Sequence, residues 1–175
     1  MIRISGIIED SIVDGEGLRY VVFLQGCKHA CRGCQNMHTW DFNGGHEIDT
    51  AEVYQAVLDN KLLSGLTLSG GDPFFQASNL LSLCKALKEN GINIWAYTGF
   101  SFDDFLNFRK GCKCDEKVEA PMIELLNYID VVVDGKFIES LKTLEKPYAG
   151  SSNQRIVDVQ ASLEQNKVIE YKLEE

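Results

Sequence analysis

The stretch Cys27-Lys28-His29-Ala30-Cys31-Arg32-Gly33-Cys34 places three thiols within eight residues, directly after the apolar run Tyr20-Val21-Val22-Phe23-Leu24. This predicts a ligand loop at a strand end, because thiolates are soft donors that bind iron–sulfur clusters, zinc or copper(I). A cubane iron–sulfur cluster usually takes four cysteines, whereas this run supplies three and no fourth follows nearby. One iron of a four-iron cluster would therefore lack a protein ligand, and an open position is typical of reactive metal sites.

A structural zinc site is the alternative for the same cysteines. Cys27, Cys31 and Cys34 could bind zinc together with His29 or His38, since three cysteines and one histidine form an ordinary zinc site. The spacing leaves both metals open, and the remainder of the chain favours the cluster.

Composition limits the class of protein. The chain has 175 residues and no linker rich in Pro, Gly or Ser, so we expect one domain over residues 1–175. It has no apolar run long enough for a membrane span and no signal-peptide pattern at its N-terminus. A net charge of −9 disfavours nucleic acid and anionic membranes as main partners. The six cysteines then favour metal or redox chemistry in a reducing compartment. We therefore expect a soluble, cytoplasmic protein that acts on a protein or a small molecule.

Apolar runs and helical periodicity alternate along the chain. Strands are expected at Ile2–Ile8, Tyr20–Leu24, Leu66–Leu68, Ile92–Tyr97, Ile129–Asp134 and Ile156–Val159, with a last edge strand at Val168–Leu173. Helices are expected from Asp49 or Thr50, over Ser78–Asn90 and Phe102–Phe108, and from Pro121 to Tyr128. This alternation predicts an α/β fold with a mostly parallel sheet. A closed barrel needs about 200 residues or more, so five or six strands predict an open partial (β/α) barrel.

Ligands of such sheets bind at the carboxyl ends of the strands. Besides the cysteine run, the segments expected at those ends are Ser69-Gly70-Gly71-Asp72-Pro73, Thr98-Gly99 and Asp134-Gly135-Lys136-Phe137. The paired glycines allow a ligand to approach the backbone, and Asp72 can accept a hydrogen bond from an ammonium group. For Asp134 and Lys136 we predict contact with a cofactor or a partner.

Other residues have less specific interpretations. Arg19 could reach a carboxylate or phosphate, although a solvated side chain is expected, and Cys84 is expected to be a buried, inert thiol. Cys112 and Cys114 could form a second metal site, a redox pair or a free exposed pair. The polar and aromatic segment 35–41 could shield a cluster from water.

The spacing of Cys27, Cys31 and Cys34 resembles the signature of the radical S-adenosylmethionine (SAM) enzymes, and Gly70-Gly71-Asp72 is similar to their Gly-Gly-Glu motif. Within that superfamily the sequence is most similar to the activating proteins of anaerobic (class III) ribonucleoside-triphosphate reductase. The other matching segments span nearly the whole chain: Asp14-Gly15-Glu16-Gly17-Leu18-Arg19, Gln25-Gly26-Cys27, Gly33-Cys34-Gln35-Asn36, Thr39-Trp40, Ser69-Gly70-Gly71-Asp72-Pro73, Asp134-Gly135-Lys136-Phe137 and Ser152-Asn153-Gln154-Arg155.

The resemblance implies a [4Fe-4S] cluster on the three cysteines and an open partial barrel of radical SAM type. It also implies SAM binding by Gly33, Cys34, Gln35, Gly70, Gly71, Asp72, Asp134 and Lys136. Reductive cleavage of SAM would give a 5′-deoxyadenosyl radical, which takes a hydrogen from a glycine Cα in the large reductase subunit. A small flavodoxin-like protein would donate the electron.

Three alternatives stay open beside this interpretation. The chain could activate another glycyl radical enzyme, such as pyruvate formate-lyase. It could also be a small-molecule radical enzyme, such as a queuosine-pathway carboxydeazaguanine synthase. The third alternative, from a different class, is a non-catalytic zinc-binding adaptor.

Overall fold

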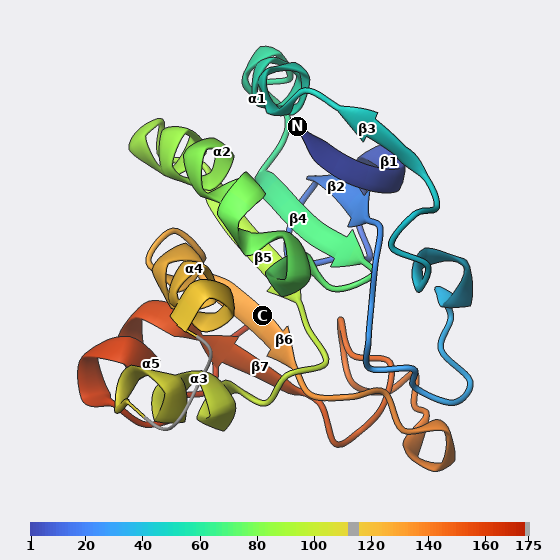
Figure 1. Ribbon diagram of the computed structural model, residues 1–175, viewed down its shortest axis with the longest axis vertical. Helices are drawn as coiled ribbons and strands as arrows, with labels where there is room; N and C mark the ends of the chain where they lie inside the picture. Colours follow the sequence, from blue (N-terminus) through green and yellow to red (C-terminus); the bar gives the residue numbers. More distant parts are fainter. Residues whose placement is uncertain (112–115, 174–175) are drawn as a thin grey trace.

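The computed structural model describes residues 1–111 and 116–173, and its centre is a seven-stranded sheet of order β3-β1-β2-β4-β5-β6-β7 (Figure 1). The strands are β1 (Ile2–Ser11), β2 (Arg19–Leu24), β3 (His46–Ile48), β4 (Gly65–Gly70), β5 (Asn93–Tyr97), β6 (Val131–Asp134) and β7 (Arg155–Asp158). The helices are α1 (Thr50–Asp59), α2 (Ala77–Glu89), α3 (Phe102–Arg109), α4 (Glu116–Leu126) and α5 (Val159–Gln165). Short 3-10 helices occupy Met37–Thr39, Pro73–Gln76 and Glu139–Leu141. None of the helices in the described ranges is long and apolar enough to cross a membrane.

The centre of the sheet is parallel and its edges are antiparallel. β2, β4, β5 and β6 run in one direction, whereas β1 and β3 on one side and β7 on the other pair antiparallel. The fold is therefore mixed α/β with a parallel centre, which confirms the predicted class at that level. Because parallel strands end at the same edge, the segments after β2, β4, β5 and β6 meet there.

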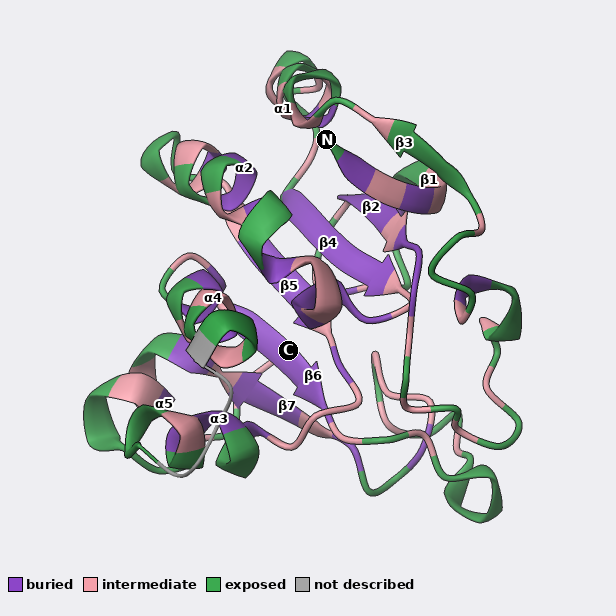
Figure 2. Ribbon diagram, viewed as in Figure 1, coloured by how far each residue is buried: buried purple, intermediate pink, exposed green. Residues whose placement is uncertain are grey.

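The two faces of the sheet are covered differently. Side chains such as Leu68, Ile94 and Val132 point into one large core that also contains the apolar sides of α1, α2 and α4. On the other face, Trp95 and Val133 belong to a smaller cluster packed by residues of loops and of the C-terminal segment. Figure 2 shows the buried strands at the centre of the molecule, with exposed residues on the outer sides of the helices.

Helix boundaries follow the capping chemistry of the sequence. The Asp49 side chain accepts from Ala51 N and forms a capping box with Glu52, as expected for the predicted start of α1. Ser101 and Asp104 form a capping box at the start of α3. These caps satisfy backbone N–H groups that have no partner within the helix.

The predicted start of a helix at Pro121 is wrong. α4 begins at Glu116 and contains Pro121 inside it. A proline there removes the hydrogen bond that its N–H would donate. Met122, Leu125 and Leu126 are nonetheless buried in the core, so tertiary packing holds the helix across the proline.

The two ends of the chain also differ from expectation. β1 extends to Ser11, beyond the predicted end at Ile8, and the antiparallel strand β3 was not predicted. The predicted edge strand 168–173 is wrong, because only an isolated bridge between Val157 and Glu170 forms there. The Tyr171 ring packs 5.6 Å from Trp95 and its hydroxyl donates to Glu16, so this segment covers the sheet face instead of extending its edge.

Arg19 is buried, so the expectation of a solvated side chain is wrong. It is 1% exposed, and its guanidinium donates to Thr67 Oγ1 at 2.7 Å and to the carbonyl oxygens of Leu66 and Asn93 at 2.7 and 3.0 Å. Gly65 makes room for it, since a Cβ there would lie 2.7 Å from Arg19 Nη2. Burial lowers the pKa of Arg19 to about 10. The side chain thus joins three strands and does not face a ligand.

Candidate functional site

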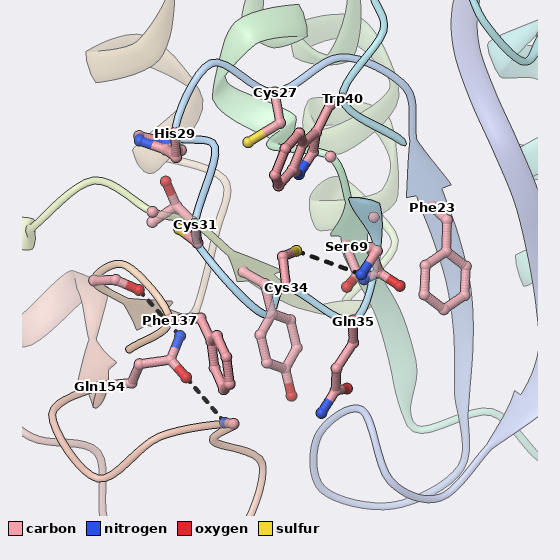
Figure 3. Close-up of a pocket in the computed structure, with 18 of the residues that line it drawn as sticks. Phe23, Cys27, His29, Cys31, Cys34, Gln35, Trp40, Ser69, Phe137 and Gln154 are labelled. Carbon is pink, nitrogen blue, oxygen red and sulfur yellow. Dashed lines mark hydrogen bonds between the residues drawn. The ribbon is translucent and has the colours of Figure 1, made fainter. Parts of the chain in front are cut away.

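A pocket of about 340 Å³ lies where the parallel strands end (Figure 3). Each of the loops after β2, β4, β5 and β6 contributes to it. Its lining residues are Asp14, Phe23, Cys27, His29, Cys31, Cys34, Gln35, Asn36, Trp40, Ser69, Gly70, Gly71, Tyr97, Thr98, Gly99, Gly135, Phe137, Gly150 and Gln154. The structure thus brings together the cysteine run, the Gly-Gly pair and Thr98-Gly99, as predicted from the sequence.

Backbone hydrogen bonds hold the cysteine loop against the following segment. Gly26 N donates to Thr39 O at 2.7 Å and Cys27 N donates to Trp40 O at 3.2 Å. The side chain of Gln25 adds a further bond, in which its Nε2 donates to the carbonyl oxygen of Asp41 at 2.6 Å. Since Trp40 itself lines the pocket, the segment expected to shield a cluster does lie beside the cysteines.

The three cysteines are free thiols of intermediate burial. Burial raises the pKa of Cys27 to about 11 and also raises the pKa of Cys31. Burial thus favours the protonated thiol at these two positions. Metal binding requires thiolates, so it would displace those protons.

The glycines of the second motif are required by the backbone of the cysteine loop. Gly70 has φ +93°, and a Cβ there would lie 2.7 Å from the backbone N and O of Leu24. At Gly71 a Cβ would lie 2.4 Å from Gly26 O. Gly71 N and Asp72 N donate to Leu24 O and Gly26 O at 2.7 and 3.0 Å. The pair thus lets the end of β4 pack directly on the start of the cysteine loop.

The Asp72 carboxylate does not line the pocket, although the resemblance implies a ligand contact for it. It is 1% exposed, and its Oδ1 accepts from Phe74 N at 3.0 Å. Its Oδ2 contacts His29 Nε2 at 2.7 Å and accepts from Thr98 Oγ1 and Gly99 N at 2.8 and 2.9 Å. Four contacts with the protein thus occupy this carboxylate, and its direct contact with an ammonium group stays a prediction.

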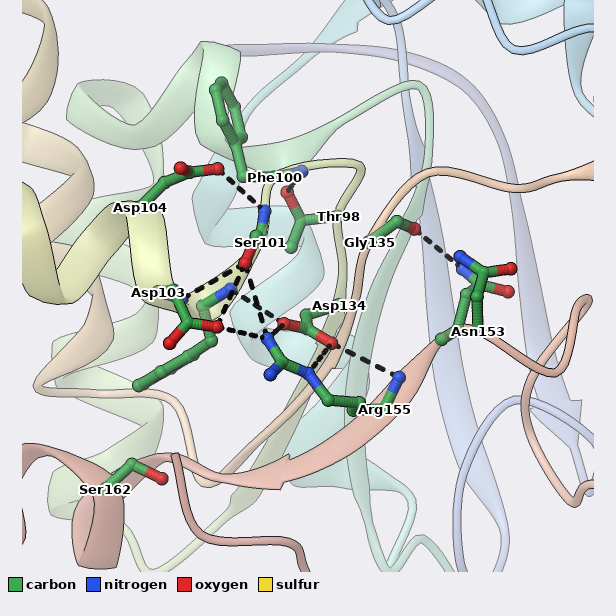
Figure 4. Close-up of polar contacts among 12 residues, drawn as sticks. Thr98, Phe100, Ser101, Asp103, Asp104, Asp134, Gly135, Asn153, Arg155 and Ser162 are labelled. Carbon is green, nitrogen blue, oxygen red and sulfur yellow. Dashed lines mark hydrogen bonds and ion pairs between the residues drawn. The ribbon is translucent and has the colours of Figure 1, made fainter. Parts of the chain in front are cut away.

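Asp134, the last residue of β6, is likewise buried and lies among polar contacts (Figure 4). Its Oδ2 accepts from Phe102 N at 2.7 Å and from Arg155 Nη2 at 2.5 Å, and its Oδ1 accepts from Arg155 Nε at 3.1 Å. Arg155 also contacts Asp103 at 2.9 Å. The hydrogen bonds that Arg155 donates to Asp134 and Asp103 raise its pKa. Asp134 thus forms an ion pair with Arg155, and its contact with a cofactor or a partner stays a prediction.

Two sequence motifs bond to each other at this corner of the pocket. Asn153 Nδ2 donates to Lys136 O at 2.9 Å, and Gln154 Nε2 donates to Gly135 O at 3.0 Å. Gln154 Oε1 accepts from Gly150 N at 2.9 Å. The segment 152–155 therefore shapes the loop after β6, while Gln154 also lines the pocket.

Some predicted residues lie outside the lining. Lys136 is exposed between two residues that line the pocket, and Gly33 lies at the outer side of the loop, near Glu139. Cys84 is buried as expected, and burial raises its pKa to about 12. Cys112 and Cys114 lie outside the described residues.

Sequence reasoning missed two aromatic residues of the site. Phe23 and Tyr97 both line the pocket, and each lies at or next to the last position of a parallel strand. Burial raises the pKa of Tyr97, so its phenol stays protonated. Their positions at strand ends were the available signal, because side chains there face the loops that bind ligands.

A protein family described as a 4Fe-4S single cluster domain matches residues 13–157, so the chain is a member of this class of iron–sulfur protein. Three relatives give the narrower family. The anaerobic ribonucleoside-triphosphate reductase-activating protein of phage T4 is 36% identical over 82% of this chain and 86% of that protein. Its namesakes from Haemophilus influenzae and Escherichia coli K12 are 35% and 32% identical, over 83% and 82% of this chain and 90% of each relative. The chain belongs to the family of anaerobic ribonucleoside-triphosphate reductase-activating proteins.

Among solved structures, the crystal structure of QueE from Escherichia coli is similar with a TM-score of 0.44 and 17% identity. The similarity covers 56% of this chain and 52% of that chain.

Proposed function

We propose that this chain activates anaerobic ribonucleoside-triphosphate reductase by generating a glycyl radical on the large subunit of that enzyme. The relatives that carry this activity in their names match most of the chain. The observation that carries the proposal is that Cys27, Cys31 and Cys34 line the same pocket as Gly70 and Gly71. A reactive cluster and a small ligand can therefore share one site.

The donor set fits a four-iron cluster with one iron left for a ligand. The three thiols surround one pocket, and thiolates are the usual ligands of such clusters. Within residues 1–111 and 116–173, no group of three His, Cys, Asp or Glu side chains lies close enough to hold a single metal ion. A cubane cluster takes each thiolate on a different iron, so its ligands surround a volume and do not meet at one point.

When bound, the reduced cluster and SAM supply one-electron cleavage of the S–C5′ bond, which yields methionine and the 5′-deoxyadenosyl radical that takes hydrogen from a glycine Cα. The residues of the chain bind the cluster and SAM, orient them and exclude water from the site. Phe23, Trp40, Tyr97 and Phe137 give the pocket aromatic walls, and its volume of about 340 Å³ lies in the range of small-molecule sites.

The finer assignments of SAM contacts belong to the same proposal. The backbone at Gly70 and Gly71 is open to the pocket and can bind the amino group. Gln35 lines the pocket beside Cys34 and can contact the adenine through its backbone, whereas Gly33 acts by shaping the loop. Lys136 is an exposed cation at this edge and can bind the carboxylate of SAM or the partner. Asp72 and Asp134 act through the residues that they hold.

Three broader assignments follow from the same function. The sheet is proposed to form the open partial barrel of radical SAM type, because parallel strands with helices on one face surround a site at their ends. A small flavodoxin-like protein is proposed as the electron donor. The cytoplasm is the proposed compartment, because the four cysteines in the described part of the chain are free thiols.

Anaerobic reconstitution tests the function directly. We expect about four irons per chain, an electron paramagnetic resonance (EPR) signal of the reduced protein that shifts when SAM is added, and formation of 5′-deoxyadenosine. With the reductase present, a glycyl radical signal should appear on its large subunit. Bound zinc, or a cluster that does not respond to SAM, would contradict the proposal.

Alanine variants identify the cluster ligands. Replacing Cys27, Cys31 or Cys34 should reduce SAM cleavage at least about a thousandfold, because loss of one thiolate removes the cluster from the reaction. Cys84→Ala is the matched control, since this thiol is buried in the core away from the pocket. Normal cleavage by any of the three pocket variants would exclude that cysteine as a ligand.

A further inference from the structure

His29 links the cysteine loop to the loop after β4. It lies between Cys27 and Cys31 (Figure 3), and its Nε2 lies 2.7 Å from Asp72 Oδ2. Both side chains are buried, with 9% of His29 and 1% of Asp72 exposed. Asp72 Oδ2 also accepts from Thr98 and Gly99, so Nε2 is the donor in this contact.

The His29 ring is enclosed by other residues as well as bonded. The rings of Phe75 and Phe100 lie 5.5 and 4.7 Å from it, the second in an edge-on geometry. A Cβ at Gly99 would lie 2.4 Å from His29 Cδ2, so the ring fills the space above this glycine. The side chain therefore has little freedom to leave Asp72.

The backbone next to His29 has an uncommon conformation. Ala30 has φ +49°, in the left-handed region that non-glycine residues seldom adopt. Such a conformation persists where surrounding contacts over-determine it. His29 precedes Ala30 in the chain, and its side chain is bonded to Asp72. This bond therefore opposes relaxation of the loop at Ala30.

We propose that His29 and Asp72 are positioning residues, which together hold the Cys27–Cys31 part of the loop against the carboxyl ends of β4 and β5. The inference rests on the proposed function, because it assigns the pair a role in presenting the cluster cysteines. It deepens that function by giving the third residue of the Gly-Gly-Asp motif a role that needs no contact with SAM. Asp72 joins three segments: its own turn through Phe74, the end of β5, and the cysteine loop.

Thiol alkylation of the metal-free protein tests the pair without the cofactors. The variants are His29→Phe, which keeps an aromatic ring but has no donor, and His29→Gln, whose amide can donate near the position of Nε2. In His29→Phe we expect Cys27 and Cys31 to react with iodoacetamide about tenfold faster. Loss of a hydrogen bond to a charged group should increase the population of the locally opened loop, in which the thiols react, by about this factor. His29→Gln should return the rates to within about threefold of wild type.

Two internal controls accompany the alkylation experiment. Peptide mapping gives a separate rate for buried Cys84, which should be unchanged in every variant. Asp134→Asn alters an equally buried carboxylate at the end of β6 and should leave Cys27 and Cys31 at the wild-type rate. Wild-type rates in His29→Phe, or equal acceleration in Asp134→Asn, would overturn the proposal.

The reconstituted protein distinguishes positioning from direct SAM contact. His29→Phe, Asp72→Asn and the double variant should each lose iron to a chelator about tenfold faster than wild type, as expected for loss of an outer-shell partner. The double variant should match the single variants, because both substitutions break the same link. SAM affinity, measured by the EPR shift, should change by the same factor in His29→Phe and Asp72→Asn. If only Asp72→Asn lost SAM affinity, Asp72 would contact SAM and the proposal would be wrong.

Failure of the proposed function gives a different result. If wild-type protein binds zinc or no cluster, that function fails, while the alkylation rates still decide whether the pair positions the loop. If wild type forms a cluster and cleaves SAM but His29→Phe behaves identically in alkylation and chelation, only the positioning role fails.

Discussion

Asp72 follows the end of β4, and Asp134 is the last residue of β6. These two strands flank β5 in the sheet. Each aspartate is 1% exposed, and each was expected to face a ligand. Both carboxylates accept hydrogen bonds from separate segments of the chain. The difference lies in the partners: Asp72 binds a histidine of the cysteine loop, whereas Asp134 binds Arg155 and the first residue of α3.

The two regions also differ in their access to solvent. The partner of Asp72 is 9% exposed, while the side chain of Arg155 is 31% exposed and that of Asp103 is 59% exposed. Screening by water weakens the second network at its outer end. Two equally buried carboxylates at neighbouring strand ends thus hold different parts of the chain: Asp72 holds the cysteine loop, and Asp134 holds the start of α3 and of β7.

The glycines beside the two carboxylates should give the largest difference. Gly70 and Gly135 have nearly equal φ values, +93° and +94°, but a Cβ at Gly70 meets the Leu24 backbone at 2.7 Å and one at Gly135 meets only Asn153 Nδ2, at 3.9 Å. Gly135→Ala should cost about 1–2 kcal/mol of unfolding free energy from backbone strain. Gly70→Ala adds backbone overlap and should cost more than about 4 kcal/mol.

Urea unfolding of the two metal-free variants measures this difference. Gly91→Ala is the control for strain without crowding, since Gly91 has φ +75° and no atom within 4 Å of a Cβ. Equal destabilisation by Gly70→Ala and Gly135→Ala would show that the close approach of β4 to the cysteine loop does not constrain this position.

Removing the second carboxylate should have the next largest effect. Asp134→Ala leaves Arg155 and the Phe102 N–H without their acceptor, and breaking a buried pair in this way costs roughly 3 kcal/mol. We expect a lower urea midpoint with wild-type alkylation rates at Cys27 and Cys31. Faster alkylation would instead mean that the network around Asp134 also holds the cysteine loop, and the two regions would not be separable.

A conservative change at Arg155 tests how the second network is built. Arg155→Lys keeps the charge but cannot place two N–H groups on the Asp134 carboxylate at once. Loss of one charge-assisted hydrogen bond should cost about 1.5 kcal/mol in urea unfolding. Arg155→Met, which keeps much of the side-chain length, should cost more because it leaves the buried carboxylate unpaired. A lysine variant as unstable as the methionine variant would show that the bidentate geometry, and not the charge, is what the site requires.

The sequence predicted the residues that meet at the pocket better than their roles there. The cysteine run, Gly70-Gly71 and Thr98-Gly99 all line one pocket, because parallel strands necessarily end at a common edge. Periodicity also located β2, β5 and β6 within about two residues. The position of a strand follows from the apolar pattern of its own residues, so it can be predicted from the local sequence.

The roles of charged residues depend on tertiary contacts and were not predictable in the same way. Nothing in the local sequence pairs Asp72 with His29, which lies 43 positions away, or Asp134 with Arg155, 21 positions away. Arg19 follows the same rule, since its partners lie on β4 and β5. Pro121 inside α4 shows that core packing can outweigh a local signal.

The smallest expected effect concerns the exposed end of the Asp134 network. A hydrogen bond from Arg155 lowers the pKa of Asp103 below its usual value of 3.8. Its contribution to stability is therefore fully present above the pKa of the unfolded chain, and it is lost as the pH falls through the lower pKa of the folded protein. Because the Asp103 side chain is 59% exposed, the contribution should be only about 0.5 kcal/mol. Urea unfolding of wild type and Asp103→Asn should differ by this amount at pH 7 and converge below about pH 3. A difference that persists in acid would mean that Asp103 stabilises the start of α3 by hydrogen bonding to Ser101 and not by its charge.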